Sequence, residues 1–399
     1  MMLTVKQQME QRCKHARFYM LCRGYETELV EMAGIIPVCN QDSGLKRKIK
    51  RFYKRASGKM HKFFFKENKP YVFEYPFTEL KKKIPKIDMV IDVSGFAYSD
   101  SWGEPMVRET LKLQAFYKKE KVKFYFMPQA WGSFLKPGVA NAVRRMLANA
   151  NKFYARDLIS QKYLSDILVV PTTRIPLMHD IVFAYNDDTP VESNVVASIA
   201  GKADQKLVIG VSPNLRVYEK STGLGKDNVY LQLLLSLANH CIHSLDAHMV
   251  FIPNEVFPPE VEAKDDRYLC RLLLENVDCP ERCIFSDQYY SVAEINAIIG
   301  VVDILISSRF HALIFGFLQE KPVMAISWSH KYKELFSLFG LEDFVLESTE
   351  MEQEDAIGLL DRVVIEREST KKKIKASLPR LEANAKAMFD EIDFNDCHF

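Results

Sequence analysis

Short apolar runs of strand length alternate with amphipathic helical stretches along most of the 399-residue chain. In the second half, strands are predicted at 206–213, 247–253, 283–287, 301–307 and 322–327, and helices at 227–245, 264–276, 291–299, 309–319 and 331–339. Parallel neighbouring strands need a crossover connection, usually a helix, so this alternation is typical of βαβ units. The pattern predicts an α/β fold built from doubly wound parallel sheets.

The first half shows the same alternation less regularly. Strands are predicted there at 16–22, 87–93, 122–128, 152–155 and 166–170, with a helix at 105–120. A polar stretch at 186–205 then interrupts the rhythm, and a long charged helical pattern at 352–392 closes the chain.

A chain of this length is too long for one ordinary hydrophobic core, so two domains are expected. The polar interruption places one Rossmann-like domain at 1–190 and a second at 200–370, followed by a helical tail at 371–399. We expect the two domains in tandem with a cleft between them. Ligands should bind at the carboxyl ends of the strands, where the loops converge.

The composition is that of a soluble globular protein, with 48% apolar residues, 27% charged residues and a net charge of +2. This balance argues against a nucleic-acid partner. Apolar runs fall short of the ~18 residues that span a bilayer, and Lys6 and Glu10 do not fit a signal peptide. The eight cysteines include one close pair, Cys279 and Cys283, without a second pair at zinc spacing. We therefore expect free thiols, no metal and a cytoplasmic location.

One segment concentrates positive charge. Residues 46–69 contain eleven Lys or Arg against one acidic residue, Glu67, with aromatic residues such as Phe52 and Tyr53 between them. Such a segment suits peripheral contact with an anionic membrane at the inner face, at about 1 kcal/mol per basic residue. The alternative is a solvated helix face whose aromatic side chains point into the core. Both interpretations stay open.

Polar residues interrupt an otherwise apolar stretch where a predicted strand of the second half ends. Ser307 and Ser308 come at the end of this strand, and Arg309 and His311 follow in the first turn of the next helix. Serine favours the N-cap position, and free amides with the helix dipole attract anions there. A cation at this point is unfavourable without an anion, and no acidic residue occurs in 304–319. The stretch therefore predicts a phosphate or carboxylate site.

A second stretch has a similar design. Asn214 and Arg216 follow the first strand of the second domain, and a loop with Gly223 and Gly225 precedes the next helix. If the two strands are parallel neighbours, Asn214 and Arg216 face the same site as Arg309.

Residues 301–341, VVDILISSRFHALIFGFLQEKPVMAISWSHKYKELFSLFGL, resemble the C-terminal signature of the polysaccharide pyruvyl transferase family. Looser matches occur upstream in order: VIDVSGFAYSDSWG with Gly95, MPQAWGSF with Gln129, ARDLIS, and MHDIVF with Asp180. The resemblance extends over about residues 3 to 346. It implies a fold similar to the two-domain GT-B glycosyltransferases, with the acceptor domain first and the donor domain second.

The resemblance also implies an activity. Family members transfer the enolpyruvyl group of phosphoenolpyruvate, without a cofactor, to two hydroxyls of a sugar in a cell-surface polysaccharide or its lipid-linked precursor. His311 would be the general acid that protonates the donor. Arg309, Arg216 and Lys331 would hold its anionic groups. Other residues expected to bind substrate are Asn214, Ser307, Ser308, Gln129 and Gly95.

Two alternatives remain. The first is a sugar-nucleotide glycosyltransferase of the same architecture. Such enzymes often hold the ribose with a carboxylate near the helix predicted at 309–319, but residues 304–319 contain no carboxylate. The second is a non-catalytic binding protein, because only Gly95 remains where the family has a run of glycines.

The family has a Gly–Asn–x–Gly–Asp-like loop before its first helix. Here residues 1–16 already have a helical pattern, and the strand predicted at 16–22 follows directly. We therefore expect that the first strand and its loop are absent. The first domain should then have a rearranged strand order or a lower stability than the second.

Overall fold

The protein is represented by a computed structural model. It describes residues 1–13, 16–21, 30–31, 34–38, 77, 80–81, 87–186, 191, 193–203, 206–257, 265–329, 331–347 and 352–393. Its internal contacts divide the chain into two units, Met1–Tyr185 with Asn384–Phe399, and Asn186–Ala383. The first boundary lies near the predicted domain limit at 190. The tail predicted at 371–399 is divided between the units instead of standing apart.

The second unit contains a six-stranded parallel sheet. Its strands are β6 (Val208–Ser212), β7 (His248–Phe251), β8 (Cys283–Ile284), β9 (Ile304–Ser307), β10 (Val323–Ser327) and β11 (Val345–Glu347). The order is β11-β10-β9-β6-β7-β8. Five of these strands were predicted, and β11 was missed. The chain adds β7 and β8 on one side of β6 and then β9 to β11 on the other, so the topological switch point lies between β6 and β9.

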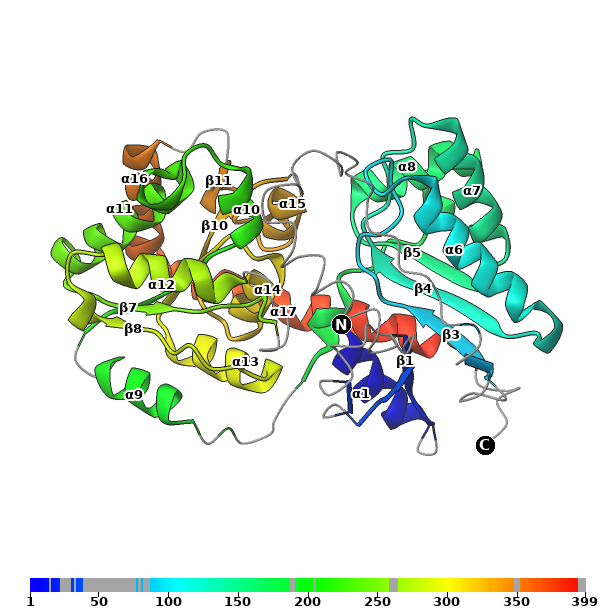
Figure 1. The fold of residues 1–399 in the computed structure, drawn as a ribbon, viewed down its shortest axis with the longest axis horizontal. Helices are drawn as coiled ribbons and strands as arrows, with labels where there is room; N and C mark the ends of the chain where they lie inside the picture. The colour runs from blue at the N-terminus through cyan, green and yellow to red at the C-terminus, as the bar shows by residue number, and fades with distance from the viewer. Residues whose placement is uncertain are drawn as a thin grey trace, which may run out of the picture. The chain divides into compact units, whose positions relative to one another are not determined.

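Helices cover both faces of this sheet, with α11, α12 and α16 on one side and α13 on the other (Figure 1). The helices are α9 (Asn194–Ala203), α10 (Leu215–Lys220), α11 (Val229–His243), α12 (Asp266–Asn276), α13 (Val292–Val301), α14 (Phe310–Leu318), α15 (Lys331–Ser337), α16 (Gln353–Ile365) and α17 (Arg367–Asp390). Short 3-10 helices occur at Gly225–Asp227, Pro280–Arg282 and Glu342–Phe344. Because both faces are covered, β6, β9 and β10 are buried at every residue, which explains their continuous apolar runs.

The described residues of the first unit form two small parallel sheets. One consists of β3 (Met89–Asp92), β4 (Lys123–Gln129) and β5 (Lys152–Ala155), and the other of β1 (Tyr19–Leu21) and β2 (Ile36–Val38). The helices described here include α1 (Met2–Arg12), α6 (Gly103–Phe116), α7 (Pro137–Ala148) and α8 (Leu158–Leu168), with 3-10 turns at Lys118–Glu120, Thr172–Arg174 and Ile181–Ala184. Helices α6 and α7 lie side by side (Figure 1), and they share a buried core with β4 and Trp131.

The strand predicted at 166–170 is wrong, because these residues begin inside the last turn of α8. Asp157 starts this helix by accepting a hydrogen bond from the Ser160 amide at 2.7 Å. Leu164 and Ile167 then bury one helical face, and Val169 ends the helix in the left-handed conformation at φ 55°. The apolar residues of this run follow the helical repeat of 3.6 residues. A segment of five residues is too short to distinguish this repeat from the alternation of a strand.

Within the described residues, α1 opens the chain and no strand precedes β1. The strand predicted at 16–22 is present as β1, and it pairs with β2, apart from the β3–β4–β5 sheet. The rearranged strand order and the lower stability expected of the first domain both stay predictions.

Helix α17 begins in the second unit and ends in the first. In the first unit, its last turn and the residues just after it are held by three ion pairs, Arg12–Asp390 at 2.6 Å, Lys152–Glu391 at 2.8 Å and Lys123–Asp393 at 2.8 Å. The C-terminal residues therefore complete the N-terminal unit.

Candidate functional site

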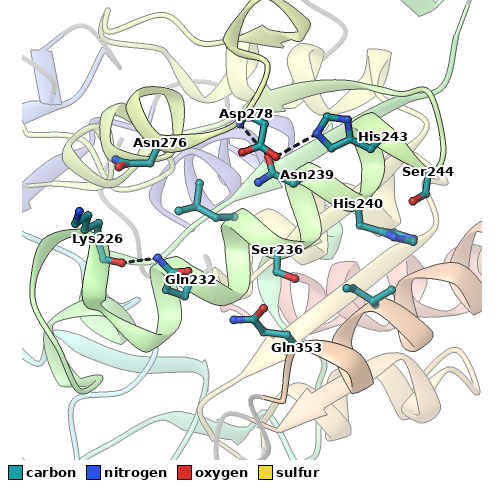
Figure 2. A pocket seen from close by; sticks show the side chains of 12 residues that line it. Lys226, Gln232, Ser236, Asn239, His240, His243, Ser244, Asn276, Asp278 and Gln353 are labelled. Carbon is teal, nitrogen blue, oxygen red and sulfur yellow. Dashed lines mark hydrogen bonds and ion pairs between the residues drawn. The ribbon is translucent and has the colours of Figure 1, made fainter.

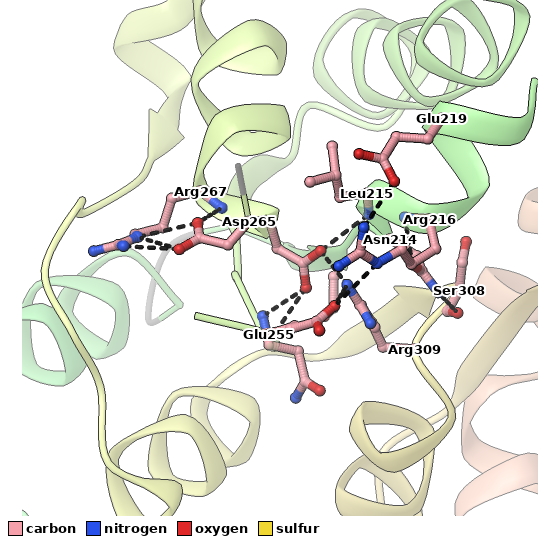
Figure 3. Close-up of polar contacts among 12 residues, drawn as sticks. Asn214, Leu215, Arg216, Glu219, Glu255, Asp265, Arg267, Ser308 and Arg309 are labelled. Carbon is pink, nitrogen blue, oxygen red and sulfur yellow. Dashed lines mark hydrogen bonds and ion pairs between the residues drawn. The ribbon is translucent and has the colours of Figure 1, made fainter. Parts of the chain in front are cut away.

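The switch point of the second unit brings together most of the predicted site residues. Strands β6 and β9 are parallel neighbours, and Ser212 is paired in register with Ser307. In sheets of this kind, ligands bind outside the carboxyl ends of the strands at the switch point. Asn214, Arg216 and Arg309 lie there together (Figure 3).

The two predicted serines hold the loop after β9 in place. Ser307 Oγ donates to the Ser212 carbonyl at 2.9 Å and accepts from the Arg309 amide at 2.9 Å. Ser308 Oγ is 2.6 Å from the hydroxyl of Tyr230. Both serines are 1% exposed. Their hydroxyls are thus bonded within the protein, and the N-cap of α14 is Arg309 instead of a serine.

The Ser308 carbonyl joins two further elements to this loop. Asn214 Nδ2 donates to it at 3.0 Å and Tyr332 Oη at 2.6 Å. Asn214 also caps α10, because its Oδ1 accepts from the Arg216 amide at 2.9 Å. The loops after β6 and β9 and the start of α15 are therefore fixed to one another.

Arg309 is neutralised by carboxylates, contrary to the expectation drawn from its sequence neighbours. Its Nη2 donates to Asp266 and to Glu255, the latter at 2.7 Å. These partners lie 43 and 54 residues away in the sequence. Burial works against the charge on Arg309, but the two carboxylates raise its pKa above the ordinary value, so the guanidinium stays charged. Its buried Nε has no hydrogen-bond partner among the described residues.

Asp266 is a site residue that the sequence interpretation missed. It is the first residue of α12, and its side chain is 0% exposed. Besides Arg309, it accepts from the amides of Leu215 at 3.0 Å, Glu255 at 2.7 Å and Asn254 at 3.3 Å. One carboxylate therefore connects the loops after β6, β7 and β9. The double aspartate at 265–266 was a signal, but it also suits an ordinary helix start.

Arg216 approaches the same carboxylate as Arg309. Its Nε lies 3.9 Å from Glu255 Oε2, and its Nη1 lies 2.8 Å from Glu219. The side chain is 49% exposed, so its charge remains accessible to solvent. The two arginines predicted to hold one ligand thus meet at Glu255 (Figure 3).

His311 and Lys331 both lie near the ring of Phe310. His311 is half-buried in the first turn of α14, and its ring centroid is 5.8 Å from that of Phe310. The ammonium of Lys331 is 5.2 Å from the Phe310 ring and 4.4 Å from the ring of Trp328. Trp328 also lies 5.2 Å from the ammonium of Lys220. These contacts form a connected group of cationic and aromatic side chains that includes Phe310, the residue after Arg309 in the sequence.

Gly95 and Gln129 belong to the first unit, at the carboxyl ends of β3 and β4. Gln129 is buried, and its Oε1 accepts from Ser94 Oγ at 3.2 Å. The Ala130 amide donates to the Gly95 carbonyl at 3.0 Å. Gly95 has φ +72°, a conformation that favours glycine, and an added Cβ would lie 3.2 Å from the Met1 side chain.

Asp180 lies in the same unit as Gly95 and Gln129. Its carboxylate pairs with Arg156 at 2.9 Å, and both side chains are buried. Its Oδ1 also accepts from the Val182 amide at 3.0 Å and caps the following 3-10 turn. Through these contacts, Asp180 neutralises Arg156 and stabilises the turn at Ile181–Ala184.

An open depression of about 590 Å³ lies over α11 in the second unit (Figure 2). Its histidines are engaged, His240 with Asp361 at 2.7 Å and His243 with Asp278 at 3.1 Å. None of the predicted site residues lines it. We therefore assign the site to the switch point and not to this depression.

The described residues contain no group of three or more His, Cys, Asp or Glu side chains suited to a metal ion. None of their helices is long and apolar enough to cross a membrane. Metal independence stays a prediction, and the basic segment at 46–69 lies outside the described residues.

Solved structures with a similar fold include sugar-nucleotide enzymes. A putative UDP-N-acetylglucosamine 2-epimerase from Listeria monocytogenes has a TM-score of 0.56 at 10% identity, covering 100% of this chain and 95% of that chain. MnaA from S. aureus, solved with UDP, has a TM-score of 0.58 at 11% identity, covering 98% and 92%. HepE from Anabaena, solved with UDP-glucose, has a TM-score of 0.52 at 10% identity, covering 98% and 90%. At these identities the likeness shows the fold alone.

The chain is thus a protein of the GT-B fold, with two arginines at the switch point of its second unit. The family model for polysaccharide pyruvyl transferase matches residues 1–330. The protein therefore belongs to the polysaccharide pyruvyl transferase family. Comparison with curated proteins gave no match.

Proposed function

We propose that the protein transfers the enolpyruvyl group of phosphoenolpyruvate to two hydroxyls of one sugar and forms a ketal. The observation that carries this proposal is the convergence of Arg309 and Arg216 on a single carboxylate at the switch point. Phosphoenolpyruvate has a carboxylate and a phosphate, so it needs at least two cationic anchors. A preformed pair of guanidiniums meets that need, because each presents a planar set of donors to an oxyanion.

The reaction balances as an addition followed by a substitution. C3 of the donor gains a proton, while the first sugar hydroxyl forms a C–O bond to C2 and gives up its proton. The bond between C2 and the phosphate oxygen then breaks, and hydrogen phosphate leaves. The second hydroxyl bonds to C2 and loses its proton, so the products are a ketal and inorganic phosphate.

His311 is the proposed acid for the first proton transfer. It stands in the first turn of α14, two residues after Arg309, so a donor held by the arginine lies close to the imidazole. A neighbouring phosphate favours the protonated ring near neutral pH. Lys331 and the backbone amides at the start of α14 would bind the phosphate group.

The acceptor is proposed to be a sugar in a cell-surface polysaccharide or in its lipid-linked precursor, as the family description supports. Gly95 and Gln129 would contribute to this part of the site. We place the reaction in the cytoplasm, with peripheral contact to the inner membrane face through residues 46–69 and without a nucleic-acid partner.

A sugar-nucleotide transferase is the second candidate, and one observation favours it. The sequence placed no carboxylate near α14, but the fold brings Glu255 to Arg309, and its side chain is 35% exposed. Such a carboxylate could accept hydrogen bonds from ribose hydroxyls. The similar structures of MnaA and HepE were solved with UDP and UDP-glucose.

An assay of phosphate release from phosphoenolpyruvate, with and without sugars that carry two free hydroxyls, tests the proposal. Acceptor-dependent release, with a pyruvyl ketal detected by mass spectrometry, is the expected result. Release of UDP from a UDP-sugar would favour the second candidate. Binding of phosphoenolpyruvate without turnover on any acceptor would indicate a binding protein.

A further inference from the structure

The two carboxylates that pair with Arg309, Asp266 and Glu255, differ in how firmly the protein holds them. Asp266 is 0% exposed and accepts three backbone amides in addition to Arg309. Glu255 is 35% exposed, and its carboxylate contacts the side chains of Arg309 and Arg216. Removing Asp266 from its place would leave buried donors unsatisfied, whereas the Glu255 side chain can rotate toward water.

The carboxylates that are ion-paired with Arg309 and Arg216 oppose the binding of an anion at these arginines. The ion pairs connect two guanidiniums, Arg309 and Arg216, to three carboxylates, Glu255, Asp266 and Glu219. An incoming phosphate and carboxylate would add negative charge next to these carboxylates. Binding becomes favourable when a carboxylate leaves, and Glu255 is the more exposed of the two on Arg309.

The geometry of Arg309 shows what Glu255 would leave behind. Nη2 contacts both carboxylates, and the buried Nε has no hydrogen-bond partner in the described part of the chain. Nε and Nη2 lie on the same edge of the guanidinium. If Glu255 withdraws, this edge can donate two parallel hydrogen bonds to a carboxylate or phosphate while Asp266 stays bound.

We propose that Glu255 occupies the anion position of the donor site and is displaced by the donor, while Asp266 stays and positions Arg309. This inference rests on the proposed function, because it takes phosphoenolpyruvate as the donor. Glu255 then determines specificity for charge, since a ligand must bring enough negative charge to replace it. Asp266 is a positioning residue, because it acts through Arg309.

Isothermal titration of the full-length protein with phosphoenolpyruvate tests both roles. Glu255→Gln removes the competing charge and keeps the side-chain size, so Kd should fall about 10-fold. Asp266→Asn loosens Arg309, so Kd should rise at least about 10-fold. Glu366→Gln is the matched control, because Glu366 also pairs with an arginine, Arg362, and its side chain is 42% exposed. Its Kd should equal that of the wild type.

Each outcome has a separate meaning. If the wild type and Glu255→Gln both fail to bind phosphoenolpyruvate, the proposed function is wrong. If the wild type binds and Glu255→Gln binds equally or more weakly, the displacement of Glu255 is overturned.

The positioning role of Asp266 has its own readouts. Asp266→Asn should raise KM for phosphoenolpyruvate and reduce the preference for this donor over inorganic phosphate in the titration. A purely structural role would instead lower the melting temperature and leave that preference unchanged. If Asp266→Asn does not fold, the titration of Glu255→Gln still tests the displacement of Glu255. This variant should fold, because the Glu255 side chain is partly exposed.

Discussion

Arg309 connects three loops of the second unit through its partners. A lysine at this position keeps the charge but has one ammonium in place of a planar fork. Arg309→Lys cannot bind Asp266 and present two parallel donors to a ligand at once. We expect Kd for phosphoenolpyruvate to rise about 10- to 100-fold, which titration of the two proteins measures. Unchanged affinity would show that the planar edge of Arg309 does not bind the donor.

His311 offers a test of the chemical step. It is half-buried in the first turn of α14, so His311→Ala should fold normally. Loss of a general acid lowers kcat by about 10²- to 10⁴-fold, and His311→Asn should behave alike because it cannot donate a proton. Steady-state kinetics with phosphoenolpyruvate measures this change, with circular dichroism as the control for folding. Activity equal to the wild type in either variant would exclude His311 as the acid.

The sequence indicated the site only in part. Local patterns predict four polar residues at the ends of strands: Asn214, Ser307, Ser308 and Arg309. The structure places these residues together. The carboxylates could not be found in this way. Asp266 reaches Arg309 only because β6, β7 and β9 are aligned in one sheet, and the double aspartate at 265–266 indicates locally no more than a helix start.

At the level of elements, the glycine loop between α10 and α11 provides a matched pair of substitutions. Gly223 and Gly225 both have positive φ, +86° and +55°. A Cβ at Gly223 would collide with the backbone of Asp227, whereas a Cβ at Gly225 meets nothing within 4 Å. Alanine at either site costs about 1 kcal/mol for the left-handed conformation. Gly223→Ala adds the backbone clash, so its free energy of unfolding should fall further.

Urea denaturation of both alanine variants checks this difference. Gly225→Ala is the control for the backbone conformation alone. Equal loss of stability in the two variants would show that the loop can relax around the Asp227 backbone.

Element prediction succeeded where periodicity was continuous over a long segment. The helix predicted at 227–245 is α11, and its start is fixed by Asn228, which accepts from the Leu231 amide at 3.1 Å. The prediction of elements failed for short apolar runs such as 166–170, which form the end of α8 and the residues after it. Strand β11 has three residues, too few for the pattern to be recognised.

At the level of the whole molecule, the basic segment at 46–69 predicts a salt-dependent association with membranes. Sedimentation with anionic liposomes should be strong at low salt and weaken at high salt, because salt screens the attraction. Reversing the charge of Lys46, Arg47, Lys48 and Lys50 should reduce it. Neutral liposomes are the control. Equal recovery on both kinds of liposome would leave the segment as a solvated surface.

The two ends of helix α17 belong to different units, and this division has a consequence for protein synthesis. The first unit needs Asp390, Glu391 and Asp393 for its ion pairs, and the ribosome makes these residues after the whole of the second unit. At ~5–20 residues per second, the roughly 200 residues between Tyr185 and Asn384 take about 10–40 s to translate. The second unit is contiguous in sequence and has all its residues before then. On the ribosome, the half of the protein that is translated first is therefore the half that completes its fold last.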